Sequence, residues 1–214
     1  MASVPKTERA RTEAEYLELE RKSEERHEYL DGEIFLMAGE SPSHGDVCTN
    51  FVMVIGSQLK GRPCRVWSKD RKVRSGPVPQ SGSSRKGLYS FPDLIVVCGE
   101  PQFLDDHQDV LLNPRVIIEV LSPTTEAFDR SEKFLRYRTH LESLTDYLVV
   151  SQTRPRIEHF ERQSNGQWVI ATTATEISET VELSSIGCTL RLSEVYDRIV
   201  FSELSDQQEG SADA

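Results

Sequence analysis

The chain has 214 residues, of which 37% are hydrophobic and 28% charged, and a formal net charge of −10 at pH 7. This length suits one sizeable domain and is too short for two comfortable ones. There is no long apolar run, and the N-terminus is charged, so the sequence predicts no membrane span and no signal peptide, and favours a cytoplasmic protein. We expect one domain over residues 12–201, with flexible tails at residues 1–11 and 202–214.

The first part of the chain predicts a helix, a strand and a second helix. Residues 12–26 are mostly strong helix formers, and Thr12 followed by Glu15 resembles a capping box. Asp31-Gly32 predicts a turn that leads into a strand at residues 33–37. Apolar residues at helical spacing then predict a helix at residues 44–60.

A basic segment follows between residues 60 and 86. It holds nine Lys or Arg and one acidic residue, a net charge of +8 within a chain of net charge −10. Residues 65–74 alternate loosely and predict one long strand, and residues 76–87 predict a mobile loop rich in Pro, Gly and Ser. Such a segment on an acidic body can hold phosphates. The alternative is a solvated ribbon whose charges pair with acids elsewhere in the fold.

Two apolar runs in the second half predict buried central strands, at residues 93–98 (DLIVVC) and 116–121 (VIIEVL). Further elements are expected as a helix at 126–140, a strand at 147–150, a hairpin of strands at 156–162 and 167–172, and a short strand and helix before residue 201. This order predicts an α/β protein of mixed α+β character, with a central mixed β-sheet flanked by helices.

The four cysteines are scattered along the chain: Cys48, Cys64, Cys98 and Cys188. They show no CxxC motif, and no Cys/His pairing at the spacing of a metal site is evident. We therefore expect reduced, mostly buried thiols.

Each of the two central strands carries one carboxylate, Asp93 or Glu119. A buried carboxylate costs several kcal/mol unless it is paired, protonated or bound to a metal. Two carboxylates on adjacent strands suit Mg²⁺ or Mn²⁺, and we expect their oxygens within about 5 Å of each other. The alternative is that Asp93 caps a strand and Glu119 pairs with a buried arginine.

The same segments carry a family resemblance. FPDLIVV followed by IIEVLSPTTEAFDRSEKFLRYR resembles the PD…(D/E)xK nuclease superfamily. The succession of HEYLDGEIFLMAG, SHGDV, the PD strand, EVLSPTT and DYLVVS resembles the bacterial Uma family of restriction endonucleases, over about residues 12–200. The resemblance implies a restriction-endonuclease-like fold and a divalent metal, Mg²⁺ or Mn²⁺, bound by Asp93, Glu119 and the Val120 carbonyl.

The sequence departs from the superfamily pattern at Leu121, where the pattern places a lysine. In a metal-dependent phosphodiesterase that lysine holds the attacking water and offsets charge in the transition state. Lys133 is the natural substitute, one turn after Asp129 on the expected helix. We expect its ammonium within about 6 Å of a Glu119 carboxyl oxygen. The alternative for Lys133 is a surface salt bridge to Asp129.

Other residues complete the predicted site. Glu28 is a candidate third catalytic carboxylate from the end of the first helix, or else a solvated acid. His44 could contact phosphate or metal, or cap the second helix, and Tyr137 is expected to be core packing. The loop at residues 76–87 is expected to flank the site. Five basic residues are expected to contact the DNA backbone: Arg65, Lys69, Arg71, Lys72 and Arg74.

Three functions are compatible with these patterns. The favoured one is a homodimeric, metal-dependent endonuclease that hydrolyses DNA phosphodiester bonds. The second is a catalytically inactive nucleic-acid-binding or dimerisation module that kept the fold; the missing lysine at Leu121 favours it and the retained acids count against it. The third is hydrolysis of a small phosphoester, for which the basic segment is irrelevant.

Overall fold

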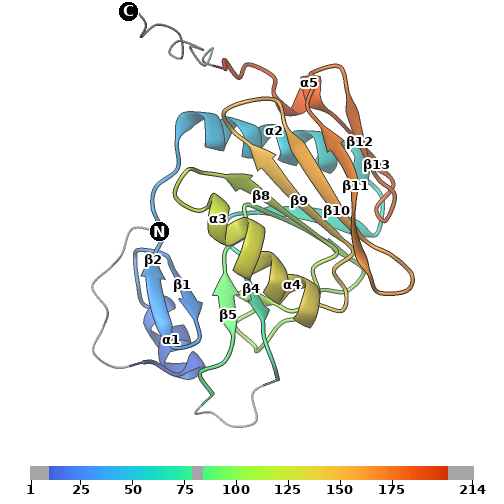
Figure 1. Ribbon diagram of the computed structural model, residues 1–214. Helices are drawn as coiled ribbons and strands as arrows, with labels where there is room; N and C mark the ends of the chain where they lie inside the picture. The colour runs from blue at the N-terminus through green and yellow to red at the C-terminus, as the bar shows by residue number, and fades with distance from the viewer. Residues whose placement is uncertain (1–9, 79–83, 202–214) are drawn as a thin grey trace, which may run out of the picture.

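The computed structural model describes residues 10–78 and 84–201. Its main feature is a six-stranded mixed sheet with the strand order β11-β10-β9-β8-β6-β3, beside a five-stranded sheet with the order β2-β1-β5-β4-β7 (Figure 1). β12 and β13 form a separate pair. The strands of the six-stranded sheet are antiparallel neighbours except β8 and β9, which run parallel.

The elements occur in this order: α1 (Glu13–Glu20), β1 (His27–Leu30), β2 (Glu33–Leu36), α2 (Pro42–Leu59), β3 (Cys64–Ser68), β4 (Lys72–Ser75), β5 (Leu88–Ser90), β6 (Leu94–Cys98), β7 (Val110–Leu111), β8 (Val116–Leu121), α3 (Glu126–Phe128), the π-helical turn η1 (Asp129–Lys133), α4 (Phe134–His140), β9 (Asp146–Ser151), β10 (Ile157–Arg162), β11 (Trp168–Ala174), β12 (Thr180–Leu183), β13 (Cys188–Arg191) and α5 (Leu192–Val195).

Helices cover both faces of the six-stranded sheet. α2 and α5 pack on one face together with the β12–β13 pair, and α4 packs on the other (Figure 1). The central strands β6 and β8 are buried along almost their whole length. The two apolar runs of the sequence are therefore the central strands that they predicted.

β8 alternates between the two faces of the sheet. Ile118 and Val120 belong to the core cluster on the α2 side, whereas Ile117 and Leu121 belong to the cluster on the α4 side. Because side chains of a strand alternate, Glu119 shares a face with Ile117 and Leu121. The carboxylate therefore points toward the helix formed by α3, η1 and α4.

Several local predictions are confirmed. Thr12 and Glu15 form the capping box at the start of α1. The helix predicted at residues 126–140 is present as α3, η1 and α4 in succession. The predicted hairpin is the antiparallel pair of β10 and β11. These features depend on contacts close in sequence, which is why the sequence reveals them.

Two predictions about the first half are wrong. The long strand expected at residues 65–74 is two strands in different sheets, separated near Lys69, whose φ of 53° lies in the left-handed region. The first helix ends at Glu20, and the residues after it enter β1, which pairs with β2 across the Asp31-Gly32 turn and with β5. The pairing with β5 joins distant segments, so local propensity could not indicate it.

The expectation of four reduced cysteines is also wrong for one pair. Cys64 and Cys98 form a disulfide between the adjacent strands β3 and β6, where the antiparallel register places them opposite each other. Cys48 and Cys188 are free and buried, as expected. The paired cysteines are 34 residues apart in sequence, so only the strand register brings them together.

Some expectations concern residues outside the described ranges. These are most of the flexible tails, at residues 1–9 and 202–214, and the tip of the predicted mobile loop, at residues 79–83. The ends of that loop are described: Ser84 accepts a hydrogen bond from the Glu13 N–H, and Gly87 accepts one from the Asp31 N–H. No helix within residues 10–78 and 84–201 is long and apolar enough to cross a membrane.

Candidate active site

A cleft of about 870 Å³ lies where β1, β2, the start of α2, the end of β8 and η1 meet. Its lining includes five residues that the sequence singled out: Glu28, His44, Asp93, Glu119 and Lys133. Val120 and Lys69 also line it. Candidates spread over more than a hundred residues of sequence thus converge on one cavity. The described ends of the loop at residues 76–87 are not among the lining residues, so the expectation that this loop flanks the site is not met there.

Asp93 and Glu119 are brought together by the pairing of β6 with β8. The antiparallel register of this pair ends where Leu94 lies opposite Ile118, and Asp93 and Glu119 are their immediate neighbours in sequence. Asp93 Oδ2 also accepts a 2.8 Å hydrogen bond from the Val120 N–H, which anchors the carboxylate. The predicted separation of the carboxyl oxygens stays a prediction.

Lys133 lies in the interior. Its Nζ is 3.0 Å from Asp129 Oδ1, 3.3 Å from Glu119 Oε1 and 3.3 Å from Glu28 Oε1. Only 6% of its side chain is exposed. The prediction that its ammonium lies within about 6 Å of Glu119 is confirmed, and the alternative of a surface salt bridge is wrong. We call Lys133, Glu28, Glu119 and Asp129 the acid-rich cluster.

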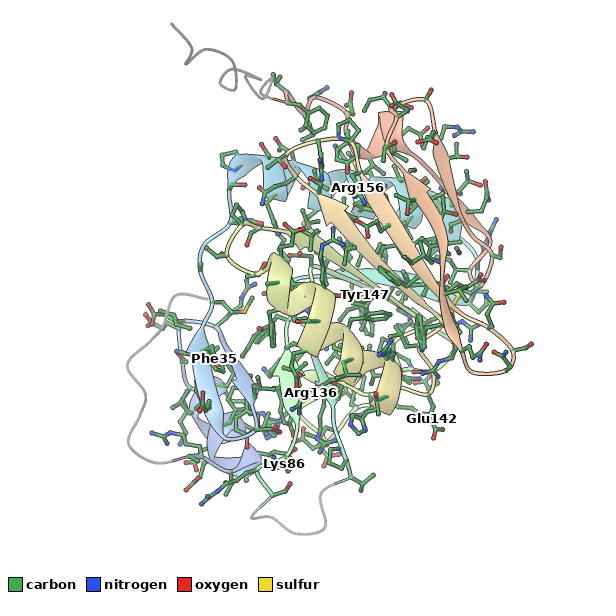
Figure 2. The ribbon with its side chains drawn as sticks, in the orientation of Figure 1. Phe35, Lys86, Arg136, Glu142, Tyr147 and Arg156 are labelled. Carbon is green, nitrogen blue, oxygen red and sulfur yellow. A yellow bond between two sulfur atoms is a disulfide. The ribbon has the colours of Figure 1, made fainter. Side chains whose placement is uncertain are left out.

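A π-helical turn places Lys133 in this position. η1 widens the helix between Asp129 and Lys133, and such widened turns are frequent at functional sites. Tyr147 of β9 lies beneath the helix and its hydroxyl donates a 2.8 Å hydrogen bond to the Asp129 carbonyl (Figure 2). The sheet therefore supports the turn that carries the lysine.

The acid-rich cluster contains three carboxylates and one ammonium. Burial raises the pKa of Glu119 well above its ordinary value, and the neighbouring carboxylates add to the rise while Lys133 opposes it. Burial acts to lower the pKa of Lys133, but Glu119, Glu28 and Asp129 outweigh it, so this pKa is raised. The lysine stays charged, and the site is short of positive charge.

Glu28 comes from a strand, and the expectation that it lies at the end of the first helix is wrong. It belongs to β1, whose pairing with β5 carries it toward the active site. Glu28 Oε1 accepts a 3.2 Å hydrogen bond from the Phe91 N–H and contacts Lys133. Phe91 stands just before Pro92 and Asp93, so Glu28 is tied to the segment that presents Asp93. The solvated-acid alternative is therefore excluded.

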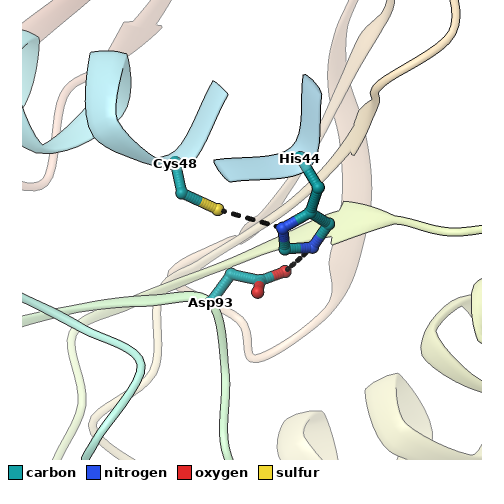
Figure 3. A group of neighbouring side chains, drawn as sticks. All are labelled: His44, Cys48 and Asp93. Atoms are coloured by element: carbon teal, nitrogen blue, oxygen red, sulfur yellow. Dashed lines mark hydrogen bonds and ion pairs between the residues drawn. The ribbon is translucent and has the colours of Figure 1, made fainter. Parts of the chain in front are cut away.

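His44 contacts Asp93 at the start of α2. Its Nε2 lies 3.2 Å from Asp93 Oδ2 (Figure 3). Burial acts to lower the pKa of His44, but the hydrogen bond and charge of Asp93, with the Val120 backbone, outweigh it and raise the pKa. The side chain that caps α2 is Ser41, which accepts a hydrogen bond from the His44 N–H. His44 is thus a residue of the cleft, and the capping alternative is wrong.

Two of the five basic residues expected to contact DNA are buried instead. Lys72 pairs with Asp109 at 3.1 Å, and Arg74 pairs with Glu13 at 2.8 Å. Their side chains are 8% and 7% exposed, so neither can reach a phosphate group. For these two residues, the alternative that the basic charges pair with acids elsewhere in the fold is the correct one.

The other three basic residues differ in position. The Arg71 guanidinium carbon lies 4.6 Å from the centroid of the Trp67 ring, and Arg65 is exposed near the same ring. Lys69 lines the cleft and pairs with Glu40. Of the five basic residues, Lys69 alone lines the cleft that holds the predicted catalytic residues.

Two further contacts in the site were not predicted. Cys48 Sγ is 3.6 Å from His44 Nδ1, so the expectation of no Cys/His pairing is wrong. The spacing of four residues on a helix was the available signal. Tyr137, expected only as core packing, is fully buried and its hydroxyl donates to Glu119 Oε1 at 3.3 Å. The same hydroxyl is 2.7 Å from Ser90 Oγ.

The sequence matches a known family over nearly its whole length. Residues 13–193 match Uma2, which is described as "Putative restriction endonuclease". The chain belongs to the Uma2 family. The matched range includes the described residues of the acid-rich cluster, together with His44 and Asp93.

Relatives from cyanobacteria resemble this Uma2 protein. "Uncharacterized protein slr1290" of Synechocystis sp. is 33% identical, with 87% of this chain and 92% of the relative covered. "Uncharacterized protein sll1609" of the same organism is 32% identical, with 78% and 90% covered. A crystal structure described as a "putative nuclease belonging to DUF820" from Anabaena variabilis has a TM-score of 0.67 at 18% identity, covering 88% of this chain and 99% of that one. The predicted restriction-endonuclease-like fold is confirmed.

Proposed function

We propose that this Uma2 protein is a metal-dependent endonuclease that hydrolyses DNA phosphodiester bonds at the acid-rich cluster and Asp93. The observation that carries the proposal is the position of Lys133. Leu121 occupies the place of the usual lysine, yet Lys133 Nζ lies 3.3 Å from Glu119 Oε1. This distance supports the proposal that a lysine from the helix takes the role of the one absent from the strand.

The residues of the cleft fit a hard divalent cation such as Mg²⁺ or Mn²⁺. Seven acidic and three basic side chains line it. Asp129 Oδ1 is buried without a well-aligned hydrogen bond, although the Lys133 ammonium is 3.0 Å away. Asp93, Glu119 and the Val120 carbonyl offer oxygen donors, which these ions prefer. When bound, such an ion supplies Lewis acidity and lowers the pKa of a water molecule.

The chain's own residues have distinct tasks in this proposal. Lys133 holds the attacking water and offsets negative charge that develops on the phosphate group. Glu28 and Asp129 keep the lysine protonated and direct its ammonium. His44 contacts a phosphate oxygen or a bound metal ion from the start of α2.

The charge of the cleft shapes how DNA binds. Without bound cations the acidic lining repels phosphate groups, so we expect DNA affinity to depend on divalent ions. Lys69, Arg65 and Arg71 are the basic residues proposed to contact the backbone, and Lys72 and Arg74 are left out because they are buried. A small phosphoester needs none of these contacts, so dependence of activity on them favours DNA.

The decisive experiment measures cleavage of DNA with Mn²⁺. Lys133→Ala is expected to lose roughly 10²–10³-fold in rate while calorimetry shows that Mn²⁺ still binds. Asp93→Ala is expected to lose both. Lys72→Ala is the matched control, because it removes another buried, ion-paired lysine outside the cleft. Unchanged cleavage by Lys133→Ala contradicts the role of Lys133. Wild-type protein that binds DNA but never cleaves it supports the inactive binding module.

We also propose that the enzyme acts as a homodimer and meets its substrate in the cytoplasm. Two copies related by two-fold symmetry present two active sites, one for each strand of a duplex. Sedimentation equilibrium at micromolar concentration tests the dimer, and a mass near the 24.3 kDa of one chain contradicts it.

A further inference from the structure

The start of α2 brings a second set of metal-binding atoms to the edge of the cleft. His44, Cys48 and Asp93 offer a nitrogen, a sulfur and an oxygen that all lie within 4.8 Å of one another (Figure 3). Cys48 Sγ is 3.6 Å from His44 Nδ1, and Asp93 Oδ2 is 3.2 Å from His44 Nε2. The endonuclease mechanism proposed above makes no use of the sulfur.

We propose that His44, Cys48 and Asp93 form a metal subsite that prefers a borderline-soft divalent ion, such as Zn²⁺, over Mg²⁺. This inference rests on the proposed function only through Asp93, which is also a ligand of the proposed Mg²⁺ or Mn²⁺ site. Its own basis is the mixed donor set.

The donor types determine which ions the subsite takes. Thiolate and imidazole are favourable ligands for Zn²⁺, whereas Mg²⁺ prefers oxygen atoms and octahedral geometry. Zinc sites that take part in catalysis have three protein ligands and leave one position open. His44 and Asp93 line the cleft and Cys48 lies behind them, so the open position faces the substrate.

The fold holds the three ligands close to the arrangement that an ion needs. His44 and Cys48 are one turn apart on the same face of α2. Asp93 is anchored by the Val120 N–H at 2.8 Å. In a tetrahedral site with Zn–N and Zn–O near 2.0–2.2 Å and Zn–S near 2.3 Å, ligand atoms stand roughly 3.3–3.6 Å apart. One imidazole nitrogen serves the ion, and separations of up to 4.8 Å have to close by about 1 Å when it binds.

The groups around His44 and Cys48 are compatible with a bound cation. Glu40 Oε2 lies 3.2 Å from His44 Nδ1 and is itself paired with Lys69. Cys48 is only 3% exposed, so its thiol is shielded from bulk solvent. Asp93 beside the imidazole thus offsets part of the charge of an ion.

The test uses Cd²⁺ or Co²⁺ alone, because each gives a thiolate-to-metal charge-transfer absorption that reports sulfur ligation directly. Wild-type protein should show the absorption at one equivalent of ion, and Cys48→Ser should lose it. In competition experiments, the affinity of Cys48→Ser for Zn²⁺ should fall below that of the wild type by more than the roughly 10–100-fold that loss of an outer-shell partner causes. Cys188→Ser, which alters the other free buried cysteine, is the matched control and should keep the absorption.

Two more variants separate this proposal from its rivals. Cys64→Ser combined with Cys98→Ser should keep the absorption, which excludes ligation by a reduced form of the disulfide pair. Glu119→Gln should keep the absorption while losing Mn²⁺-dependent cleavage, so failure of the endonuclease proposal leaves this test intact. Absorption that persists in Cys48→Ser, or its absence from wild type, overturns the subsite. If Cys48→Ser does not fold, His44→Ala takes its place. Loss of the absorption in His44→Ala then supports the subsite, and its persistence overturns it.

Discussion

Two groups of buried charges in this protein differ in their balance. At Glu13 one acid meets one base: Arg74 donates to its carboxylate at 2.8 and 3.2 Å, and the Tyr89 hydroxyl donates at 2.7 Å. In the acid-rich cluster three carboxylates share the single ammonium of Lys133. The first group is neutral and fully hydrogen-bonded, whereas the second has excess negative charge in an interior that disfavours it.

The pKa values show the consequence of this difference. Burial acts to lower the pKa of Arg74, but Glu13 outweighs it, so this pKa is raised and the guanidinium stays charged. Burial raises the pKa of Glu119, and Lys133 offsets that rise only in part. Buried charge alone therefore does not identify a functional site here. An excess of one sign distinguishes the acid-rich cluster, and a proton or a metal ion would relieve it.

The largest expected effect breaks the balanced group. Glu13→Gln leaves the Arg74 guanidinium buried without its anion and should lower the free energy of unfolding by about 3–5 kcal/mol. Urea denaturation at neutral pH measures this. Glu18→Gln is the control on the same helix, since Glu18 pairs with Lys22 at the surface, where both side chains are 72% exposed. A loss for Glu13→Gln as small as that of the control contradicts a structural role for the pair.

Metal binding should relieve the acid-rich group and leave the balanced one unaffected. At a Mn²⁺ concentration of about 100 times its Kd, the free energy of unfolding should rise by about 2.7 kcal/mol. Unfolding followed with Mn²⁺ and then with excess EDTA measures the gain. Asp93→Ala should abolish the gain and Glu13→Gln should keep it. An equal gain in all three proteins points to binding elsewhere.

Glu119→Gln should stabilise the metal-free protein, the opposite of Glu13→Gln. The ordinary pKa of the carboxyl is 4.5 and the folded value is raised well above it. Between those two values the folded state binds more protons than the unfolded state, so stability falls as pH rises. The variant cannot titrate and lacks this loss of stability, so its advantage over the wild type should grow as pH rises above 4.5. Urea unfolding from about pH 5 to pH 8 tests this, and parallel curves for variant and wild type contradict it.

The smallest expected effect concerns Tyr137. Tyr137→Phe removes a donor to Glu119 and should cost about 1 kcal/mol of stability. It should also raise the pKa of Glu119 further, because a hydrogen bond to the ionised form is lost. Proton release on Mn²⁺ binding, measured by calorimetry in two buffers, should then extend to higher pH. Tyr147→Phe, which loses a bond to a main-chain carbonyl instead, should leave proton release unchanged.

The sequence by itself determined the features that depend on near neighbours. Helical spacing of apolar residues predicted α2, a helix was expected after Pro123, and apolar runs predicted β6 and β8. A carboxylate within each run indicated a site, since a lone buried acid is costly. Leu121 stands where the superfamily pattern has a lysine, and Lys133, one turn after Asp129, was predicted to replace that lysine.

Only the tertiary structure decided which charged residues belong to the site. Lys69, Lys72 and Arg74 are near neighbours in one basic segment, yet Lys69 lines the cleft while the other two are buried with acids from distant parts of the chain. Glu28 reaches the cluster through the pairing of β1 with β5, which the sequence did not indicate. The physical reason is that the role of a charged side chain depends on which groups surround it. Strand pairing and burial bring those groups together from distant parts of the sequence, and local sequence patterns do not reveal them.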